Sequence, residues 1–291
     1  MNPVNDGLCR ALLINLDRDA QRLAWMSQQL AAANIQFERV PAVLGTQTPE
    51  SVASFFPGEN QALLNPLRVG EIGCYASHLV AMQRIATGAL GPVVLVLEDD
   101  LRVSADLLDV IRDSTAKLPE GWDMLRLSNP PKRSVKVVAS LADGRDLIQY
   151  SKIPNSTGAY LITVEGAQKL LRPVPRFRPV DEDMRRPWRY GLREFGIVPA
   201  PVQPDILDQS SIELLQPKST LQRRGLTARL IGKVEFTHLL DRPLFNIRTL
   251  GVAAWLTCLG QNIWDKIARP TGLPGRIRHR ESFQIVERRQ T

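Results

Sequence analysis

One segment constrains the fold more than any other: an apolar run that ends in three acids. Val93–Leu97 are five consecutive apolar or β-favouring residues, preceded by the turn formers Gly91-Pro92 and followed by Glu98, Asp99 and Asp100. An uninterrupted apolar run of this length is typical of a strand buried on both faces in a parallel sheet. Ligands of such open α/β sheets bind outside the carboxyl ends of the strands. The sequence therefore predicts an α/β fold with a polar site at this point.

The remaining periodicity supports the α/β class. The chain opens with a strand at 11–16, an amphipathic helix at about 20–33 and a second strand at 35–40, as a doubly wound sheet does. Further helices are predicted at about 70–85, 106–117 and 165–171, and further strands at 124–127, 156–163 and 195–199. Residues 46–69 and 128–156 are rich in turn formers, and no elements are predicted there.

Charge divides the chain into two parts. Residues 218–291 hold 14 Lys/Arg against 5 Asp/Glu, a net charge of +9, so the total of +7 leaves −2 for residues 1–217. We predict a domain at 8–216 and a basic, mostly helical tail at 217–291. The tail contains an apolar stripe, Val252–Ile263, which predicts a helix lying on a membrane surface; a solvated basic helix pair is the alternative. The stripe is too short to cross a bilayer.

Other patterns narrow the function by exclusion. The three cysteines, Cys9, Cys74 and Cys258, lie far apart, which favours reduced thiols and a cytoplasmic setting. Residues 1–10 do not form a secretory signal. The sequence contains no P-loop, GxGxxG or GxSxG motif and no metal-type Cys/His spacing. These absences disfavour P-loop enzymes, dehydrogenases, zinc enzymes and α/β-hydrolases.

The acids after the apolar run are the first candidate site. In an extended strand tip Glu98 and Asp100 share one face, with Asp99 on the other. Three neighbouring carboxylates repel one another unless a cation neutralises them, and Mg²⁺ or Mn²⁺ prefers such oxygen ligands. The alternative is that these acids cap the next helix.

A second candidate lies on the helix that begins near Gly70. Glu71, Cys74 and His78 are spaced i, i+3 and i+7, so they share a side of that helix. They fit either a mixed metal site or, more commonly, a packed histidine or one that lines a substrate site.

The third candidate is the acid cluster Asp181, Glu182 and Asp183. One of these carboxylates can serve as a general base for an acceptor hydroxyl; an exposed acidic helix start is the alternative. Arg18 and Arg22 follow the first strand and suit either phosphate binding or a solvated helix face.

In this order the segments resemble glycosyltransferase family 25, the bacterial lipopolysaccharide and lipooligosaccharide glycosyltransferases related to collagen galactosyltransferases. The resemblance covers about residues 8–216. The pairing of GEIGC-x-x-SH with LEDD is its most specific part. The matching stretches are Ile14–Arg18 with Arg22, Phe37–Gly45, Gly70–Leu79, Val96–Asp100, Thr157–Ile162, Pro179–Asp181 and Pro204–Ile212.

The resemblance implies a GT-A type fold, Rossmann-like with a mostly parallel sheet flanked by helices, a nucleotide-sugar donor and a divalent ion, Mn²⁺ or Mg²⁺. It places the metal at Glu98 and Asp100 and makes Asp181 the catalytic base or acceptor contact. The donor-site residues that it implies are Asn15, Arg18, Glu71, His78, Gln209 and Ser211. The chain departs from the family pattern at Asp17, where a second basic residue is usual, and at 209–211, where another acid is common.

We therefore predict a metal-dependent, inverting enzyme that transfers a hexose, galactose first, from a UDP-sugar to a lipopolysaccharide or lipooligosaccharide acceptor. Because that acceptor is lipid-linked, we expect a cytoplasmic protein at the inner face of the cytoplasmic membrane. A catalytically silent sugar-binding relative is one alternative. A basic nucleic-acid-binding protein is another, but no binding motif is present and few aromatic residues lie among the basic ones, so no nucleic-acid partner is expected.

Overall fold

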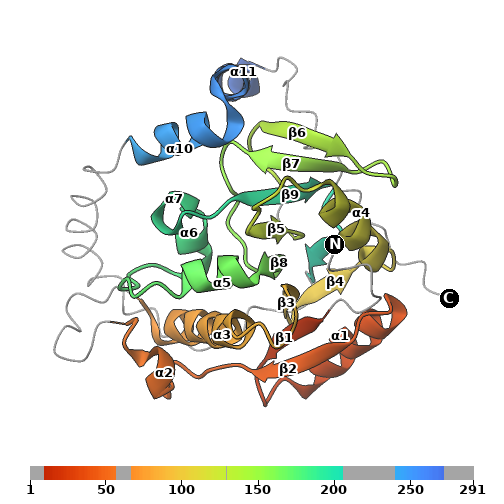
Figure 1. Ribbon diagram of the computed structural model, residues 1–291, viewed down its shortest axis with the longest axis vertical. Coiled ribbons are helices and arrows are strands. Elements are labelled where there is room, and N and C mark those ends of the chain that lie inside the picture. The colour runs from red at the N-terminus through yellow and green to blue at the C-terminus, as the bar shows by residue number, and fades with distance from the viewer. Residues whose placement is uncertain (1–9, 57–66, 129, 206–239, 272–291) are drawn as a thin grey trace.

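The computed structural model describes residues 10–56, 67–128, 130–205 and 240–271, which form an eight-stranded sheet with helices on both faces (Figure 1). The strand order is β2-β1-β3-β8-β5-β9-β7-β6. β7 and β8 run against the other six strands, so the predicted mostly parallel α/β sheet is confirmed. The strands are β1 (Ala11–Asn15), β2 (Phe37–Pro41), β3 (Val93–Glu98), β5 (Met124–Arg126), β6 (Val135–Ser140), β7 (Asp146–Tyr150), β8 (Ala159–Thr163) and β9 (Glu194–Val198).

Helices cover the two faces of the sheet. In Figure 1 the α3 side of the sheet carries α5, α6 and α7, and the opposite side carries α1 and α4. A short antiparallel pair, β4 (Leu101–Val103) with β10 (Val202–Pro204), follows the acid-tipped strand. The helices are α1 (Ala20–Ala32), α2 (Glu50–Ala53), α3 (Val69–Ala86), α4 (Leu107–Lys117), α5 (Val164–Leu170), α6 (Val180–Met184) and α7 (Pro187–Tyr190).

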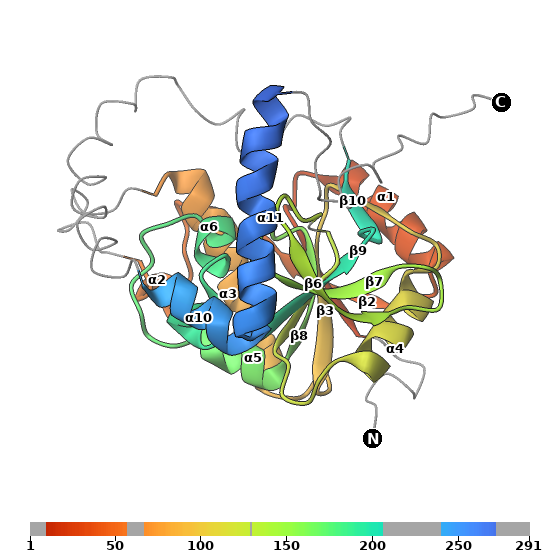
Figure 2. The same ribbon diagram turned by 90° about the horizontal axis from the view of Figure 1, so that it is seen from above.

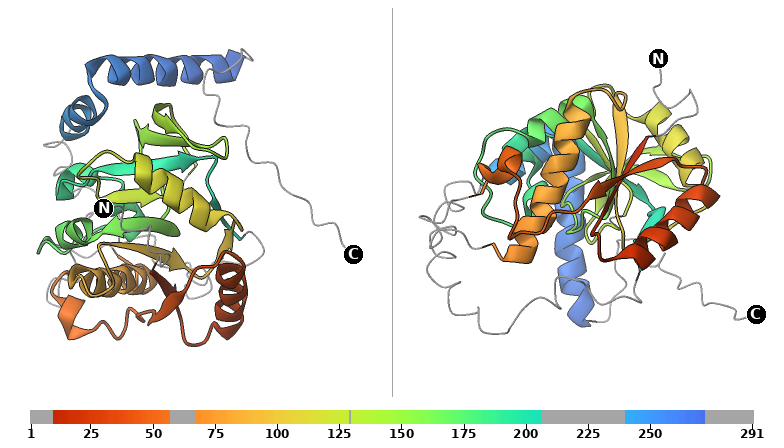
Figure 3. Two further views of the ribbon diagram at one scale, coloured as in Figure 1. Left: turned by 45° about the vertical axis from the view of Figure 1, so that its right-hand side comes forward. Right: turned by 90° about the horizontal axis from the view of Figure 1, so that it is seen from below.

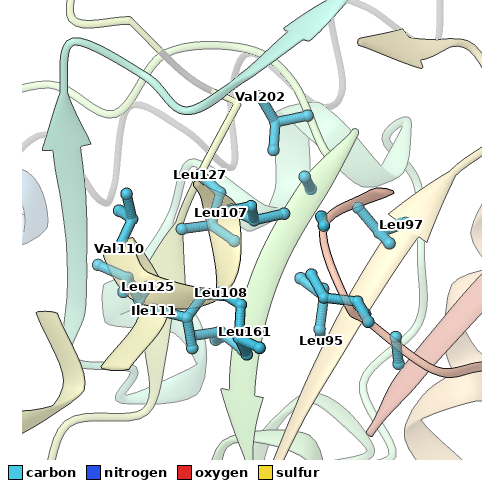
Figure 4. Packing of buried hydrophobic residues seen from close by; sticks show 14 of the residues in the cluster. Leu95, Leu97, Leu107, Leu108, Val110, Ile111, Leu125, Leu127, Leu161 and Val202 are labelled. Carbon is cyan, nitrogen blue, oxygen red and sulfur yellow. The ribbon is translucent and has the colours of Figure 1, made fainter. Parts of the chain in front are cut away.

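The central strand β3 shows why its sequence is continuously apolar. Leu95 and Leu97 pack with Ile111 of α4 in one buried cluster (Figure 4). Val94 and Val96 belong to a second buried cluster on the opposite face, beneath α3. Successive side chains of a strand point to opposite faces, and both faces are covered. The alternation continues to Glu98, which therefore lies on the α3 side.

The segment 128–156, for which the sequence predicted no elements, contains the antiparallel pair β6 and β7. Its residues alternate poorly because the register shifts between Val137 and Ala139. β6 lies at the end of the strand order and is only partly buried, so burial imposes little apolar pattern on it. The short helix α2 within 46–69 was also not predicted.

Two C-terminal helices, α10 (Asp241–Leu250) and α11 (Val252–Thr271), lie beside the β6 edge of the sheet (Figures 2 and 3). Polar contacts attach them. Ser134 Oγ donates to the carbonyl of Cys258 at 2.9 Å, and Asn246 Nδ2 donates to the carbonyl of Ser151 at 2.9 Å. The described part of the predicted tail is therefore docked on the sheet domain.

The outer face of α11 is apolar. Its exposed large apolar side chains have 37–58% of their surface accessible: Val252, Leu256, Leu259, Ile263, Trp264 and Ile267. In a surface helix of a globular protein such residues normally face the core; here they face away from it. Among the described helices, none has the length together with the apolar character that crossing a membrane requires.

Candidate active site

The three acids at the end of β3 separate toward different partners. Glu98 turns toward α3, where its Oε1 accepts a hydrogen bond from Thr157 Oγ1 at 2.6 Å and lies 3.1 Å from His78 Nε2. The other ring nitrogen of His78 lies 2.8 Å from the Tyr160 hydroxyl. Burial raises the pKa of Glu98, but the hydrogen bonds with His78 and Thr157 outweigh it and hold that pKa below its usual value.

Asp99 turns the opposite way, toward β1 and α1. Its Oδ2 accepts from Asn15 Nδ2 at 2.7 Å, and its Oδ1 lies 3.4 Å from Arg22 Nη1. Asn15 is fixed in turn by Arg39, whose Nε donates to Asn15 Oδ1 at 2.9 Å. Burial nevertheless raises the pKa of Asp99 above its ordinary value. The sequence-based expectation that Asp99 and Glu98 face opposite ways agrees with these contacts.

Asp100 differs from both neighbours. Within the described ranges no side chain donates a hydrogen bond to its carboxylate. Burial, followed by the negative charges of Glu98 and Asp99, raises the pKa of Asp100 to about 6. Its main-chain carbonyl accepts from the backbone N–H of Asp205 at 2.8 Å, which brings the chain after β10 back to the acid tip. Asp100 is thus the least neutralised carboxylate of the three.

Cys74 of α3 lies where the acids converge. The ligand atoms of Cys74, His78 and Glu98 all lie within 4.8 Å of one another. Burial, and then the charges of Glu98, Asp181 and Asp100, raise the pKa of the Cys74 thiol well above its usual value. Carboxylates from the β3 tip and from α6 therefore surround one point on α3.

Two sets of side chains at this point suit a divalent ion, one with oxygen ligands only and one with mixed ligands. Glu98 with Asp100 offers hard oxygen ligands of the kind that Mg²⁺ and Mn²⁺ prefer, and the raised pKa of Asp100 reports negative charge that a cation would relieve. Cys74, His78 and Glu98 form a softer set, which suits ions such as Zn²⁺ better. Glu98 belongs to both, so the residues fit a metal whichever set holds it.

Glu71 lies at the start of α3, and its predicted donor contact stays a prediction. Its carboxylate accepts a hydrogen bond from the backbone N–H of Arg68 at 2.8 Å and so caps the start of α3. It still contributes negative charge near Cys74, but it is not among the three residues grouped as possible metal ligands.

Asp181 and Asp183 of α6 occupy contrasting environments. Asp181 Oδ1 accepts from the backbone N–H of Glu182 at 2.8 Å, and its Oδ2 accepts from the Asn155 amide. Burial raises the pKa of Asp181, and the charges of Glu182 and Glu98 raise it further. Asp183 is fully buried instead and accepts hydrogen bonds from the hydroxyls of Tyr75 and Tyr190 at 2.8 and 2.7 Å.

The remaining candidates from the sequence do not share one location in the structure. The Arg18 side chain is 47% exposed and lies 3.8 Å from Asp19, whereas Arg22 reaches Asp99. The two arginines therefore do not act as one pair. Gln209 and Ser211 lie outside the described residues, and their predicted donor contact stays a prediction.

Sequence reasoning missed some polar groups of the site. Arg39 holds Asn15, and Thr157 and Tyr160 complete the hydrogen bonds around Glu98 and His78. Thr157 and Tyr160 belong to the TGAYLI stretch, which reads as a plain strand. The polar side chains of Thr157, just before β8, and Tyr160, inside it, were the available signal in an otherwise apolar stretch.

Comparison with known proteins agrees with this geometry. A model of the glycosyltransferase family 25 (LPS biosynthesis protein) matches residues 9–184. The chain belongs to glycosyltransferase family 25. This membership confirms the resemblance described from the motifs, and with the mostly parallel sheet it makes the fold GT-A-like.

Individual relatives are 28–32% identical to this family 25 chain over the residues that align. A glycosyltransferase 25 family member from Anopheles gambiae is 32% identical over 187 residues, 60% of this chain and 31% of its own. Procollagen galactosyltransferase 1-A from Xenopus laevis is 32% identical over 183 residues, covering 58% and 29% respectively. Inactive glycosyltransferase 25 family member 3 from Mus musculus is 28% identical over 187 residues, covering 60% and 31%.

The matched part of the chain thus spans about a third of the length of these relatives. Among solved structures, mouse xyloside xylosyltransferase 1 in its apo form aligns with 66% of this chain and 70% of its own, at 13% identity and a TM-score of 0.29.

Proposed function

We propose that this family 25 member is an active, metal-dependent glycosyltransferase that moves a hexose from a UDP-linked donor to a saccharide acceptor, with inversion at the sugar carbon. The observation that carries the proposal is the Asp100 carboxylate: it is partly buried, lies beside two further acids and receives no side-chain hydrogen bond within the described ranges. A leaving nucleoside diphosphate needs its growing negative charge neutralised. The carboxylates of Glu98 and Asp100 are the groups suited to hold the cation for it.

The chain's own residues then have distinct tasks. A divalent ion bound at Glu98 and Asp100 would supply electrostatic stabilisation of the leaving diphosphate. His78 orients Glu98 through its Nε2, and Asn15 orients Asp99. We retain the other predicted donor contacts, Arg18, Glu71, Gln209 and Ser211, and Glu71 also caps the start of α3.

Asp181 is our candidate general base. Its carboxylate is half-buried, its pKa is raised toward the operating range, and the charge of Glu98 contributes to that shift. A base whose pKa lies nearer neutrality accepts a proton from an acceptor hydroxyl more effectively. Asn155 and the backbone of Glu182 fix the orientation of the two carboxylate oxygens.

The sugar and the acceptor are inferred from kinship. Galactose is our choice because relatives are named procollagen galactosyltransferases, and the family description names lipopolysaccharide biosynthesis. We therefore propose a lipid-linked lipopolysaccharide or lipooligosaccharide acceptor at the inner face of the cytoplasmic membrane.

The apolar outer face of α11 supports that location. We propose that it lies in an anionic bilayer surface, because its apolar side chains point outward and residues 218–291 carry a net charge of +9. Flotation with phosphatidylglycerol vesicles tests this. Leu256→Asn with Ile263→Asn should release the protein, whereas Thr257→Asn, a change at an exposed polar position of the same helix, should not. Unchanged flotation of the double variant overturns the membrane contact.

A panel of UDP-hexoses, with and without Mn²⁺, tests the proposed activity. We expect metal-dependent hydrolysis of UDP-galactose above the other donors, and faster release of UDP when acceptor saccharide is added. Asp181→Asn should lower acceptor-dependent transfer by roughly 10²- to 10⁴-fold and leave donor binding in place. Binding without turnover identifies a silent sugar-binding relative, and indifference to every nucleotide sugar overturns the proposal.

A further inference from the structure

A group of basic side chains lies between the sheet domain and α10–α11. Lys152 follows β7, and its neighbours in the chain are held by two arginines. Arg242 Nη2 donates to the carbonyl of Ser151 at 3.3 Å, and Arg185 Nε donates to the carbonyl of Ile153 at 3.3 Å. The two guanidinium groups therefore flank Lys152 from α10 and from the end of α6.

Two further cations complete what we call the cationic cluster: Arg133, Lys152, Arg185, Arg242 and Lys266. Burial, and then the charges of Arg242, Arg185, Arg133 and Lys266, lower the pKa of Lys152. Burial and the charges of Arg185 and Arg133 lower the pKa of Arg242 as well. These groups are therefore close enough to repel one another.

The cationic cluster itself contains no carboxylate, although Arg185 is close enough to Asp181 for its charge to oppose the raised pKa of that acid. In the described part of the chain, none of its members forms an ion pair with a carboxylate, although ion pairs are frequent elsewhere, such as Arg126 with Glu194 at 2.7 Å. Like charges held together at this density cost stability unless an anion joins them. The arrangement is therefore suited to an anionic ligand.

The cluster also adjoins the candidate base. Arg185 Nη1 donates to Asn155 Oδ1 at 3.1 Å, and the amide of the same Asn155 donates to Asp181. One asparagine thus connects the cluster to the carboxylate that we propose to receive the acceptor proton. On the other side, Arg242 belongs to α10, and Lys266 belongs to α11, the helix whose outer face is apolar.

We propose that the cationic cluster binds a phosphate group of the acceptor and so places the acceptor hydroxyl at Asp181. Arginine and lysine bind phosphate through charge-assisted hydrogen bonds, and the half-buried setting of Arg133, Lys152 and Arg185 strengthens those that they form. The phosphate belongs either to the saccharide or to a lipid headgroup. This inference rests on the proposed function for its purpose, but the anion site itself can be tested alone.

The first experiment titrates inorganic phosphate into the full chain by calorimetry at low ionic strength, with EDTA and without nucleotide. We expect Lys152→Gln with Arg242→Gln to weaken phosphate binding by about tenfold or more. Arg248→Gln removes an exposed charge from α10 outside the cluster and should change the affinity less than about twofold. Phosphate binding by the double variant as tight as that of the wild type overturns the proposal.

A melting experiment guards against a folding defect. Because the cluster is repulsive, the double variant without phosphate should melt at the wild-type temperature or above it, and phosphate should raise the melting temperature of the wild type only. A lower melting temperature in the double variant, with an unaltered phosphate response, indicates a purely structural cluster and overturns the site.

A third measurement separates the two sources of phosphate. Competition by glucose 1-phosphate indicates a saccharide phosphate, whereas loss of phosphatidylglycerol-vesicle binding in the double variant indicates a headgroup. Donor hydrolysis does not involve the cluster. If the wild type hydrolyses the donor but does not bind phosphate, the anion site is wrong and the proposed function stands. Phosphate binding without any donor turnover defeats the proposed function alone.

Discussion

Two acid triplets, Glu98–Asp100 and Asp181–Asp183, look alike in the sequence and are treated oppositely by the fold. Asp183 is fully buried, yet it accepts hydrogen bonds from Tyr75 and Tyr190 and contacts the Arg189 guanidinium. Asp100 is partly buried and receives no side-chain hydrogen bond from the described residues, and its pKa is raised to about 6. One carboxylate is stabilised by its surroundings, and the other is not.

The difference shows how buried charge divides between structure and function. A paired carboxylate holds elements together: Asp183 joins α3, α6 and α7 through its tyrosine and arginine partners. A carboxylate without such partners lowers the stability of the fold, and carboxylates of this kind are found mainly at functional sites. The same residue type should therefore give opposite changes in stability when aspartate is replaced by asparagine.

The largest expected effect is on transfer. Asp100→Asn keeps the shape of the side chain but removes the charge that we assign to the metal, so the rate of sugar transfer should fall by roughly 10²- to 10³-fold. Initial rates at saturating donor and Mn²⁺ measure this. A rate equal to that of the wild type would end the assignment of Asp100 as a metal ligand.

The next effect is on folding. Asp183 is the carboxylate partner of both Arg176, which is fully buried, and Arg189. Asp183→Asn leaves these two guanidinium groups without that anion, so the free energy of unfolding should fall by about 3 kcal/mol. Urea unfolding followed by tryptophan fluorescence gives the value. If stability is retained while transfer is lost, Asp183 belongs to the active site rather than to the structural network.

A smaller effect has the opposite sign. The pKa of Asp100 is raised from 3.8 to about 6 in the folded chain, so its ionisation destabilises the folded state. That penalty is absent below the unfolded pKa and grows as the pH rises through the folded one. Without added metal, Asp100→Asn should therefore raise the free energy of unfolding by about 1–2 kcal/mol at pH 7, after allowance for solvent screening. Urea unfolding measures this gain. The gain should shrink between pH 6 and pH 4, and a constant gain across that range contradicts the cause.

The smallest effect is expected at the middle acid of the second triplet. Glu182 is partly exposed, and its main-chain rather than its side-chain atoms make the hydrogen bonds described here. Glu182→Gln should change stability by less than about 0.5 kcal/mol and transfer by less than about twofold. It is the matched control for both neighbours, and a large loss would mean that the wrong acid of α6 has been assigned.

The elements with strong periodicity were predictable, and the weakly patterned ones were not. β3 was identified because both of its faces are covered, so every position from Val94 to Leu97 must be apolar. β6 is partly exposed at the sheet edge and its register shifts, and its sequence consequently has no clear period of two. The existence of an acidic site at the end of β3 followed from strand polarity alone, whereas the partners of each acid depended on α3 and β8.

The sequence by itself determined the α/β class, the position of the acid tip and, through its motifs, the family. These follow from local order: side-chain alternation, capping residues and short spacings are properties of neighbouring residues. Only the tertiary structure decided which carboxylate receives no side-chain hydrogen bond from the described residues, and that Glu71 caps a helix. It also decided that Arg133, Lys152, Arg185, Arg242 and Lys266 gather, with Arg185 connected to Asp181 through Asn155. Those outcomes depend on residues far apart in the chain, such as Lys152 and Lys266, and the energy of a charge depends on everything packed around it.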